Sequence, residues 1–138
     1  MKRRFLIATH SSLAEGFTNA LKFFAGDDID VAFINAYIDG KPIDDKIDLF
    51  ISNVKDEDEL IIMTDLLAGS VNQSLFKFVS REHTHILTGI NLALALSLVL
   101  ESFNCYLTSE RVNELVKSSK ENIVYMNEYQ VEVDGDDE

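Results

Sequence analysis

The sequence predicts an α/β fold in which helices cover both faces of an open, mostly parallel β-sheet. Short continuous apolar runs alternate with longer segments of helical periodicity along the chain, with one strand about every 25–30 residues. This alternation is typical of right-handed strand–helix–strand crossovers. The chain has 138 residues, the size of one ordinary domain, and no repeat or low-complexity linker divides it. We therefore expect a single domain over residues 1–138.

Each predicted element rests on its hydrophobic period. Four short apolar runs have the length of strands buried on both faces, and they cover residues 5–8, 31–34, 60–63 and 85–87. Apolar residues that recur every three or four positions predict helices over residues 13–24, 43–54, 70–80, 91–101 and 108–120. Tyrosines and valines that suit a pleated surface predict a last strand over residues 123–133, followed by a charged tail.

The chain is strongly acidic, with 24 aspartates and glutamates against 12 lysines and arginines and a formal net charge of −12. Binding to nucleic acid requires clustered basic side chains, so this composition argues against a nucleic-acid partner. The basic start, Lys2-Arg3-Arg4, is short, and we interpret it as the solvated flank of the first strand.

The apolar stretches are too short for membrane insertion. The run at residues 5–8 is too short for a signal peptide, and the one at residues 92–100 is about half a membrane span. Cys105 is the only cysteine, so no intramolecular disulfide can form, as is usual in a reducing cytosol. We therefore expect a soluble, cytoplasmic protein that does not itself span a membrane.

Polar residues gather in three loops that follow predicted strands, at residues 9–12, 64–70 and 88–91. In open α/β sheets, ligands bind beyond the carboxyl ends of the strands. Each loop leads into a predicted helix, and two of them match the capping-box pattern, Ser12 to Glu15 and Ser70 to Gln73. The start of a helix carries free N–H groups, so two converging helix starts would suit an anion such as phosphate.

His10 is the candidate nucleophile in the first of these loops. A neutral imidazole is a good nucleophile near pH 7, and His10 lies among small polar residues just past a buried strand. Asp65 ends the neighbouring strand, where its carboxylate can hold one ring nitrogen and leave the other free to attack. Ser70 and the backbone at Gly69 would then contact a phosphoryl group. The structural alternatives are a satisfied core histidine for His10 and helix-capping roles for Asp65 and Ser70.

Four further polar residues form two pairs, one beside His10 and one at the opposite end of the sheet. Thr9 and Ser11, the neighbours of His10, are phosphate-binding candidates because of their hydroxyls. His83 and His85 lie at the start of the fourth strand, at the opposite end of the sheet, and we interpret them as surface positions. Their spacing is not specific for a metal, and no third cluster of ligands supports one. We therefore expect neither a metal nor a cofactor.

Three segments together resemble the IIA components of the mannose-type (mannose/fructose/sorbose) bacterial sugar phosphotransferase system. Residues 7–11 resemble the family's phosphohistidine segment, residues 65–70 its aspartate-to-serine motif, and residues 88–92 its glycine-(Val/Ile)-asparagine segment. The order and spacing of the three segments agree with the family over nearly the whole chain.

The resemblance implies a fold, a reaction and partners. The family's sheet has strand order 2-1-3-4, with a further antiparallel strand that is exchanged in a homodimer, here residues 123–133. The resemblance also implies that His10 takes a phosphoryl group from the carrier protein HPr and passes it to a histidine on a IIB component. Asp65 would orient His10, and Ser70 would contact the phosphoryl group. We expect IIB on another polypeptide, and the sugar is not indicated because specificity resides in the membrane components.

Three positions depart from the family pattern. Ser11 stands where the family usually has a glycine, Ala68 where it has the first of two glycines, and Val71 where it has a proline. The loops are therefore less rich in glycine, which bears on how closely the backbone can approach a phosphate. A regulatory relative that keeps the fold without phosphoryl transfer is one alternative that these departures leave open.

Two other protein classes are alternatives for the same loops. A response-regulator receiver needs an acidic pair after the first strand, where residues 9–12 contain no acid. A flavodoxin-like FMN module normally needs aromatic residues in the later loops, where Leu66, Leu67 and Ile90 stand. Both classes therefore fit less well than a phosphoryl carrier.

Overall fold

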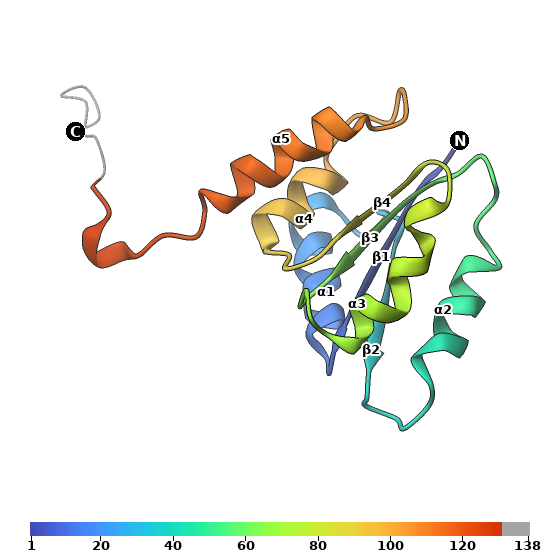
Figure 1. The fold of residues 1–138 in the computed structure, drawn as a ribbon. Helices are drawn as coiled ribbons and strands as arrows, with labels where there is room; N and C mark the ends of the chain where they lie inside the picture. The colour runs from blue at the N-terminus through green and yellow to red at the C-terminus, as the bar shows by residue number, and fades with distance from the viewer. Residues whose placement is uncertain (131–138) are drawn as a thin grey trace.

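The computed structural model describes residues 1–130, which contain one four-stranded parallel sheet. Its strands are β1 (Arg3–His10), β2 (Val31–Ala36), β3 (Glu59–Thr64) and β4 (Thr84–Leu87), and their order across the sheet is β2-β1-β3-β4. All three neighbouring pairs are parallel. The predicted α/β class and the strand order implied by the family resemblance are confirmed (Figure 1).

Helices cover both faces of the sheet (Figure 1). On one face lie α1 (Leu13–Ala25) and α4 (Leu92–Val99), and α5 (Ser109–Lys120) packs on α4. On the other face lie α2 (Ile43–Ile51) and α3 (Ser70–Leu75). The sheet is therefore a middle layer, and its carboxyl edge is left to the loops.

Alternate side chains of the central strands enter two hydrophobic cores. Phe5 and Ile7 of β1 belong to the core beneath α1 and α4, while Leu6 and Ala8 belong to the core beneath α2 and α3. All six residues of β3 are buried as well. Because both faces of β1 and β3 are covered, these strands appear in the sequence as unbroken apolar runs, which explains why they are predicted correctly.

The predicted helices are present, but several end earlier or change form. α2 ends at Ile51 instead of residue 54, and α4 ends at Val99 instead of residue 101. The helix predicted over residues 70–80 is an α-helix only to Leu75 and continues as the 3₁₀-helix η1 (Phe76–Ser80). None of the η1 residues is fully buried, and Phe78 packs only partly buried against the core beneath α2 and α3. Burial therefore supports a regular α-helix less here than over α3. Among residues 1–130, no helix has the length and apolar character needed to cross a membrane.

Neither predicted capping box forms. Ser12 precedes α1 but makes no capping hydrogen bond, because its backbone lies at φ −89° and ψ 12° instead of the extended conformation usual for an N-cap. The hydroxyl of Thr9 accepts the Ala14 N–H instead (2.6 Å). At α3 the N-cap position is Gly69, which makes Ser70 the first residue of the helix itself.

Part of the basic chain start is buried, which corrects the interpretation of this segment as a solvated flank. The side chains of Arg3 and Glu59 are both fully buried and form an ion pair. Arg3 also donates to the carbonyl oxygens of Ser102 (2.7 Å) and Cys105 (2.9 Å), and Glu59 accepts the Leu107 N–H (2.6 Å). The pair therefore fixes the connection between α4 and α5 to the start of the sheet.

The last described residues do not form the predicted strand. Residues 123–130 contain only a short 3₁₀ turn, η2 (Met126–Glu128), and extend away from the sheet beyond α5 (Figure 1). Their apolar side chains are exposed, by 75% at Ile123 and by 71% at Met126. A strand needs a neighbour for its backbone hydrogen bonds, and within residues 1–130 no strand lies beside this segment. Residues 131–133 of the predicted strand lie outside the described residues.

Candidate functional site

His10 and Asp65 come together at the carboxyl edge of the sheet. His10 is the last residue of β1, and Asp65 directly follows β3, the strand beside it. The register pairs Ala8 with Thr64, which brings the side chains that follow to the same edge. One carboxylate oxygen of Asp65, Oδ2, accepts two hydrogen bonds from His10, one from the backbone N–H (3.0 Å) and one from the ring nitrogen Nδ1 (2.9 Å).

These hydrogen bonds determine the ionisation of Asp65 and the tautomer of the His10 ring. Burial raises the pKa of the Asp65 carboxyl, but the hydrogen bonds from the backbone and ring of His10 outweigh it, so the pKa lies below its ordinary value. Asp65 is therefore an ionised carboxylate at neutral pH, which only accepts hydrogen bonds. Nδ1 of His10 must then carry a hydrogen, which leaves the lone pair of the neutral ring on Nε2. The His10 side chain is 35% exposed, so a reacting group can reach the ring.

The backbone of the second loop lies directly against the imidazole. A Cβ atom on Gly69 would be 2.9 Å from His10 Cε1, the carbon between the two ring nitrogens, and 3.2 Å from the carbonyl oxygen of Leu66. The first distance is shorter than real Cβ atoms show, so this position needs a glycine as long as the ring stays in place. The structure thus brings Gly69 next to His10.

Asn72, a residue that no sequence motif marks, holds this loop in shape. Its side-chain nitrogen donates to the Leu67 carbonyl (3.0 Å), and its side-chain oxygen accepts the Thr64 hydroxyl (3.1 Å). These bonds tie the end of β3 to the first turn of α3, across the residues that contain Asp65 and Gly69. The only sequence signal for this role is a polar side chain early in a predicted helix.

A second unmarked residue, Tyr37, contacts both His10 and Ser70. Tyr37 directly follows β2, which borders β1 on the side away from β3. Its ring stacks on the His10 imidazole, with ring centres 5.5 Å apart and planes inclined by 29°. The hydroxyls of Tyr37 and Ser70 are hydrogen-bonded to each other. The sequence signal for Tyr37 is its position alone, at the carboxyl end of the strand next to that of His10.

Thr9 and Ser11, the neighbours of His10, differ in their exposure to solvent. Thr9 is fully buried, and its hydroxyl accepts the Ala14 N–H, so it supports the start of α1. Ser11 is exposed, and its φ of +56° lies in the left-handed region that glycine adopts most easily. Its N–H donates to the Ala36 carbonyl (2.9 Å), which ties the His10 loop to the end of β2. This conformation accounts for the glycine usual at this position in the family that the sequence resembles.

The remaining histidines lie at the other end of the sheet, as predicted, but they are partly buried and not simple surface positions. The rings of His83 and Tyr106 stack with centres 3.6 Å apart and planes inclined by 6°. Nε2 of His85 is hydrogen-bonded to the Leu107 carbonyl (3.0 Å). Across residues 1–130, no group of three or more His, Cys, Asp or Glu side chains is arranged to hold a metal.

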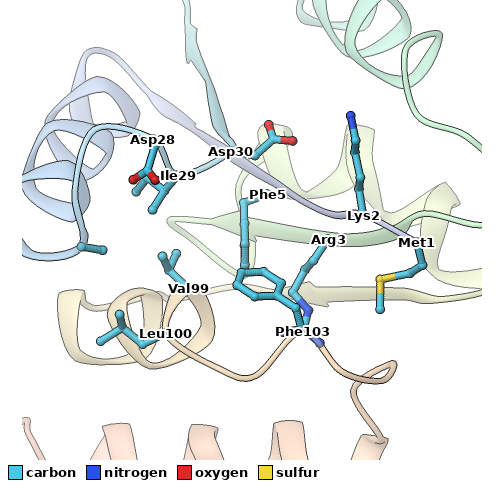
Figure 2. A pocket seen from close by; sticks show the side chains of 11 residues that line it. Met1, Lys2, Arg3, Phe5, Asp28, Ile29, Asp30, Val99, Leu100 and Phe103 are labelled. Carbon is cyan, nitrogen blue, oxygen red and sulfur yellow. The ribbon is translucent and has the colours of Figure 1, made fainter.

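A cavity of about 620 Å³ lies at that same far end, beside the start of β1 (Figure 2). Apolar side chains line much of it, among them Phe5, Val99, Leu100 and Phe103. None of its lining residues belongs to the loops around His10. The cavity is therefore separate from the candidate site.

The sequence and the fold both match proteins of the sugar phosphotransferase system (PTS). Residues 4–120 match the family described as PTS system fructose IIA component, EIIA-man. A crystal structure from Klebsiella pneumoniae, assigned as a phosphoenolpyruvate-dependent sugar phosphotransferase system permease, is 32% identical to the chain, with 93% of each chain covered and a TM-score of 0.84. A search of curated proteins finds no match.

Two more distant structures show a shared fold. The phosphotransferase system component EIIA of Streptococcus agalactiae is 24% identical over 91% of this chain and 98% of its own, with a TM-score of 0.73. The mannose/sorbose-specific IIA subunit of Enterococcus faecalis is 15% identical over 96% of this chain and 100% of its own, with a TM-score of 0.76. From the match over residues 4–120, we conclude that the chain belongs to the mannose-type IIA (EIIA-man) family of the sugar phosphotransferase system.

Proposed function

We propose that this chain is a phosphoryl carrier in which Nε2 of His10 takes the phosphoryl group. The observation that carries the proposal is the pair of hydrogen bonds from His10 to Oδ2 of Asp65 (3.0 and 2.9 Å). They hold the ring in one orientation and one tautomer and leave Nε2 as the nucleophile. Family membership supports the same role, because IIA components carry phosphoryl groups.

The proposed transfer exchanges one nitrogen–phosphorus bond for another. The Nε2 lone pair of His10 attacks the phosphorus of a phosphohistidine on the donor, HPr, and the electron pair of the broken bond returns to the donor nitrogen. Nδ1 keeps its proton, so the phosphorylated ring carries a positive charge beside the Asp65 carboxylate. That carboxylate stabilises the charged ring. Transfer onward to a histidine of the IIB component is the same kind of step, with His10 as the leaving group.

The phosphoryl oxygens need hydrogen-bond donors beside Nε2. We assign this role to Ser70 and the backbone N–H groups that follow Gly69, because Gly69 lies against the ring and the first N–H groups of a helix have no partner within it. The exposed Ser11 is a further donor in the first loop. Thr9 is left out because its side chain is fully buried beneath the start of α1 and cannot reach a bound group. The proposal requires no cofactor and no metal.

The proposed protein partners have an exposed apolar surface to bind. Leu13 directly follows the first loop of the site, Leu66 and Leu67 belong to the second, and all three are largely exposed. We propose that HPr and the IIB component dock here in turn, in the cytoplasm. Because the phosphoryl group passes directly from ring to ring, both partners must reach the same side of His10.

We also propose that two copies of the chain exchange their C-terminal segments, residues 123–133. β4 is an edge strand of the sheet, and strand edges with unpaired backbone groups favour the addition of another strand. The exposed side chains of Ile123 and Met126 would gain packing partners in such a dimer. The exchange therefore accounts for the apolar side chains between Ile123 and Tyr129 that the single chain leaves exposed.

Incubation with phosphoenolpyruvate, enzyme I and HPr tests the carrier function. The chain should gain acid-labile phosphate, and His10→Ala should abolish the label. His85→Ala is the matched control, because it removes a histidine from β4, at the far end of the sheet, and should keep the label. Labelling that survives His10→Ala would reject the assignment of His10.

A regulatory relative without phosphoryl transfer is the second candidate. The departures from the family pattern at Ser11, Ala68 and Val71 favour it, because they change the loops that would hold the phosphoryl group. A folded chain that binds HPr and gains no phosphate in the same assay would support this alternative. The receiver and flavodoxin alternatives are dropped, because the chain belongs to the IIA family.

A further inference from the structure

Tyr37 has an unusual backbone conformation for an aromatic residue. Its φ is +66°, in the left-handed region that bulky side chains rarely adopt, and it directly follows the end of β2. Such outliers persist where the surrounding structure requires them, and they cluster at functional sites. Ser11 has a φ of +56°, and its N–H donates to the carbonyl of Ala36, the residue before Tyr37 (2.9 Å). Two left-handed residues thus join the ends of β1 and β2 next to His10.

The side chain of Tyr37 contacts two residues of the proposed site. Its ring stacks on His10, with centres 5.5 Å apart, and its hydroxyl is hydrogen-bonded to that of Ser70. The residue is 61% exposed, so burial of apolar surface does not account for its orientation. The contacts to His10 and Ser70 do account for its orientation. The three residues come from three separate segments of the chain.

We propose that Tyr37 is a positioning residue that directs the hydroxyl of Ser70 toward the phosphoryl group on His10. A serine hydroxyl has a single hydrogen and two lone pairs. Tyr37 donates its own hydrogen to Ser70 Oγ, and the hydrogen of Ser70 then points to a phosphoryl oxygen on Nε2. The stacked ring also restricts rotation of the imidazole. This inference rests on the proposed carrier function of His10 and adds to it a residue outside the sequence motifs.

The effect of Tyr37 should fall on the rate of transfer. The phosphoryl group in flight carries negative charge on its three peripheral oxygens, and donors fixed in advance stabilise this charge better than donors that must reorient. Docking of the donor protein depends on the shape of the surface, to which the tyrosine ring contributes more than its hydroxyl. Loss of the hydroxyl should therefore lower kcat and leave KM nearly unchanged.

Tyr37→Phe tests the inference because it keeps the ring and removes only the hydroxyl. With phosphorylated HPr as the substrate, we expect kcat to fall about three- to tenfold, while KM stays within about twofold. Tyr106→Phe is the matched control. It removes a hydroxyl that donates to the Glu57 carbonyl (2.6 Å), just before β3 at the far end of the sheet, and both constants should stay unchanged.

A double-variant cycle tests whether Tyr37 acts through Ser70. Ser70→Ala and the double variant Tyr37→Phe/Ser70→Ala should have the same kcat, because the tyrosine hydroxyl has nothing left to direct. Additive losses would reject an action through Ser70. An unchanged kcat in Tyr37→Phe, with the parent chain labelled on His10, would overturn this inference and leave the carrier function standing. A parent chain that gains no phosphate would overturn both.

Discussion

At the scale of single residues, Oδ2 of Asp65 accepts both the backbone N–H and the ring N–H of His10. The carboxylate therefore sets the orientation of the ring and also holds the backbone that carries the ring. An asparagine at this position has the same shape, but its amide nitrogen is a donor and its oxygen is a weaker acceptor than a carboxylate oxygen. The negative charge of Asp65 thus contributes to the fold of the loop as well as to the proposed chemistry.

Asp65→Asn should make the chain less stable than the parent at neutral pH, and the difference should close in acid. The folded-state pKa of Asp65 lies below its ordinary value of 3.8. Its carboxylate therefore contributes stability above the unfolded pKa, and this contribution is lost as the pH falls through the lower folded pKa. Urea midpoints of the two chains, measured between about pH 7 and about pH 2, give the difference in their stability at each pH.

Asp48→Asn serves as the control for this series, because Asp48 is exposed on α2 and should show little difference from the parent at any pH. A destabilisation of Asp65→Asn that stays the same from neutral pH to well below 3.8 would contradict a stabilising role for the charge.

Gly69→Ala and Gly16→Ala should have opposite effects on stability. A Cβ on Gly69 would lie 2.9 Å from His10 Cε1, so the ring or the loop must shift. We expect the free energy of unfolding to fall by about 1–3 kcal/mol and phosphorylation to slow. A Cβ on Gly16, within α1, meets nothing within 4 Å, and alanine there should stabilise by about 0.5–1 kcal/mol.

Urea denaturation and initial labelling rates measure both glycine variants. Gly16→Ala should be labelled like the parent, because it changes no residue of the two loops at His10. A Gly69→Ala chain as stable and as active as Gly16→Ala would show that the loop does not pack against the imidazole in solution.

At the scale of helices and strands, the sequence predicts best the strands that helices cover on both faces. β1 and β3 lie between two layers of helices, so their apolar runs are unmistakable. Ser12 shows a local pattern that fails, because a capping box works only with an extended N-cap backbone, which this loop does not have. Tyr37 is not predicted, because its role comes from contacts with His10 and Ser70 that only the folded chain brings together. Asn72 is not predicted, because its hydrogen bonds to Thr64 and Leu67 depend on the path of the loop after β3.

Glu59→Gln should strongly destabilise the connection between α4 and α5. It leaves the buried guanidinium of Arg3 without its counter-ion, which costs about 3–5 kcal/mol when a buried pair is broken from one side. Glu114→Gln is the matched control, because Glu114 pairs with Arg111 on the surface (2.9 Å) and should have little effect. Thermal and urea unfolding compare the two, and equal effects would contradict a structural role for the buried pair.

At the scale of the whole molecule, the proposed chemistry and the proposed assembly occupy different places. The His10 site lies at the carboxyl edge of the sheet. The cavity (Figure 2) and the buried ion pair of Arg3 and Glu59 lie at the opposite end. Residues 123–130 leave the body of the molecule beyond α5 (Figure 1). A strand is expected over residues 123–133 because their side chains suit one, but side-chain types cannot supply the neighbouring strand. Pattern alone therefore predicts a strand over residues 123–130, where the described part of the chain has none.

Deleting residues 123–138 should convert the proposed dimer into a monomer without removing the site. All of the site residues from Thr9 to Asn72 precede the deletion, so His10 should still accept phosphate. The β4 edge would lose its proposed cover, so the deleted chain should be less soluble than the parent. Light scattering after size-exclusion chromatography measures the mass of each chain. A monomeric parent, or a deleted chain that remains a dimer, would contradict exchange of this segment.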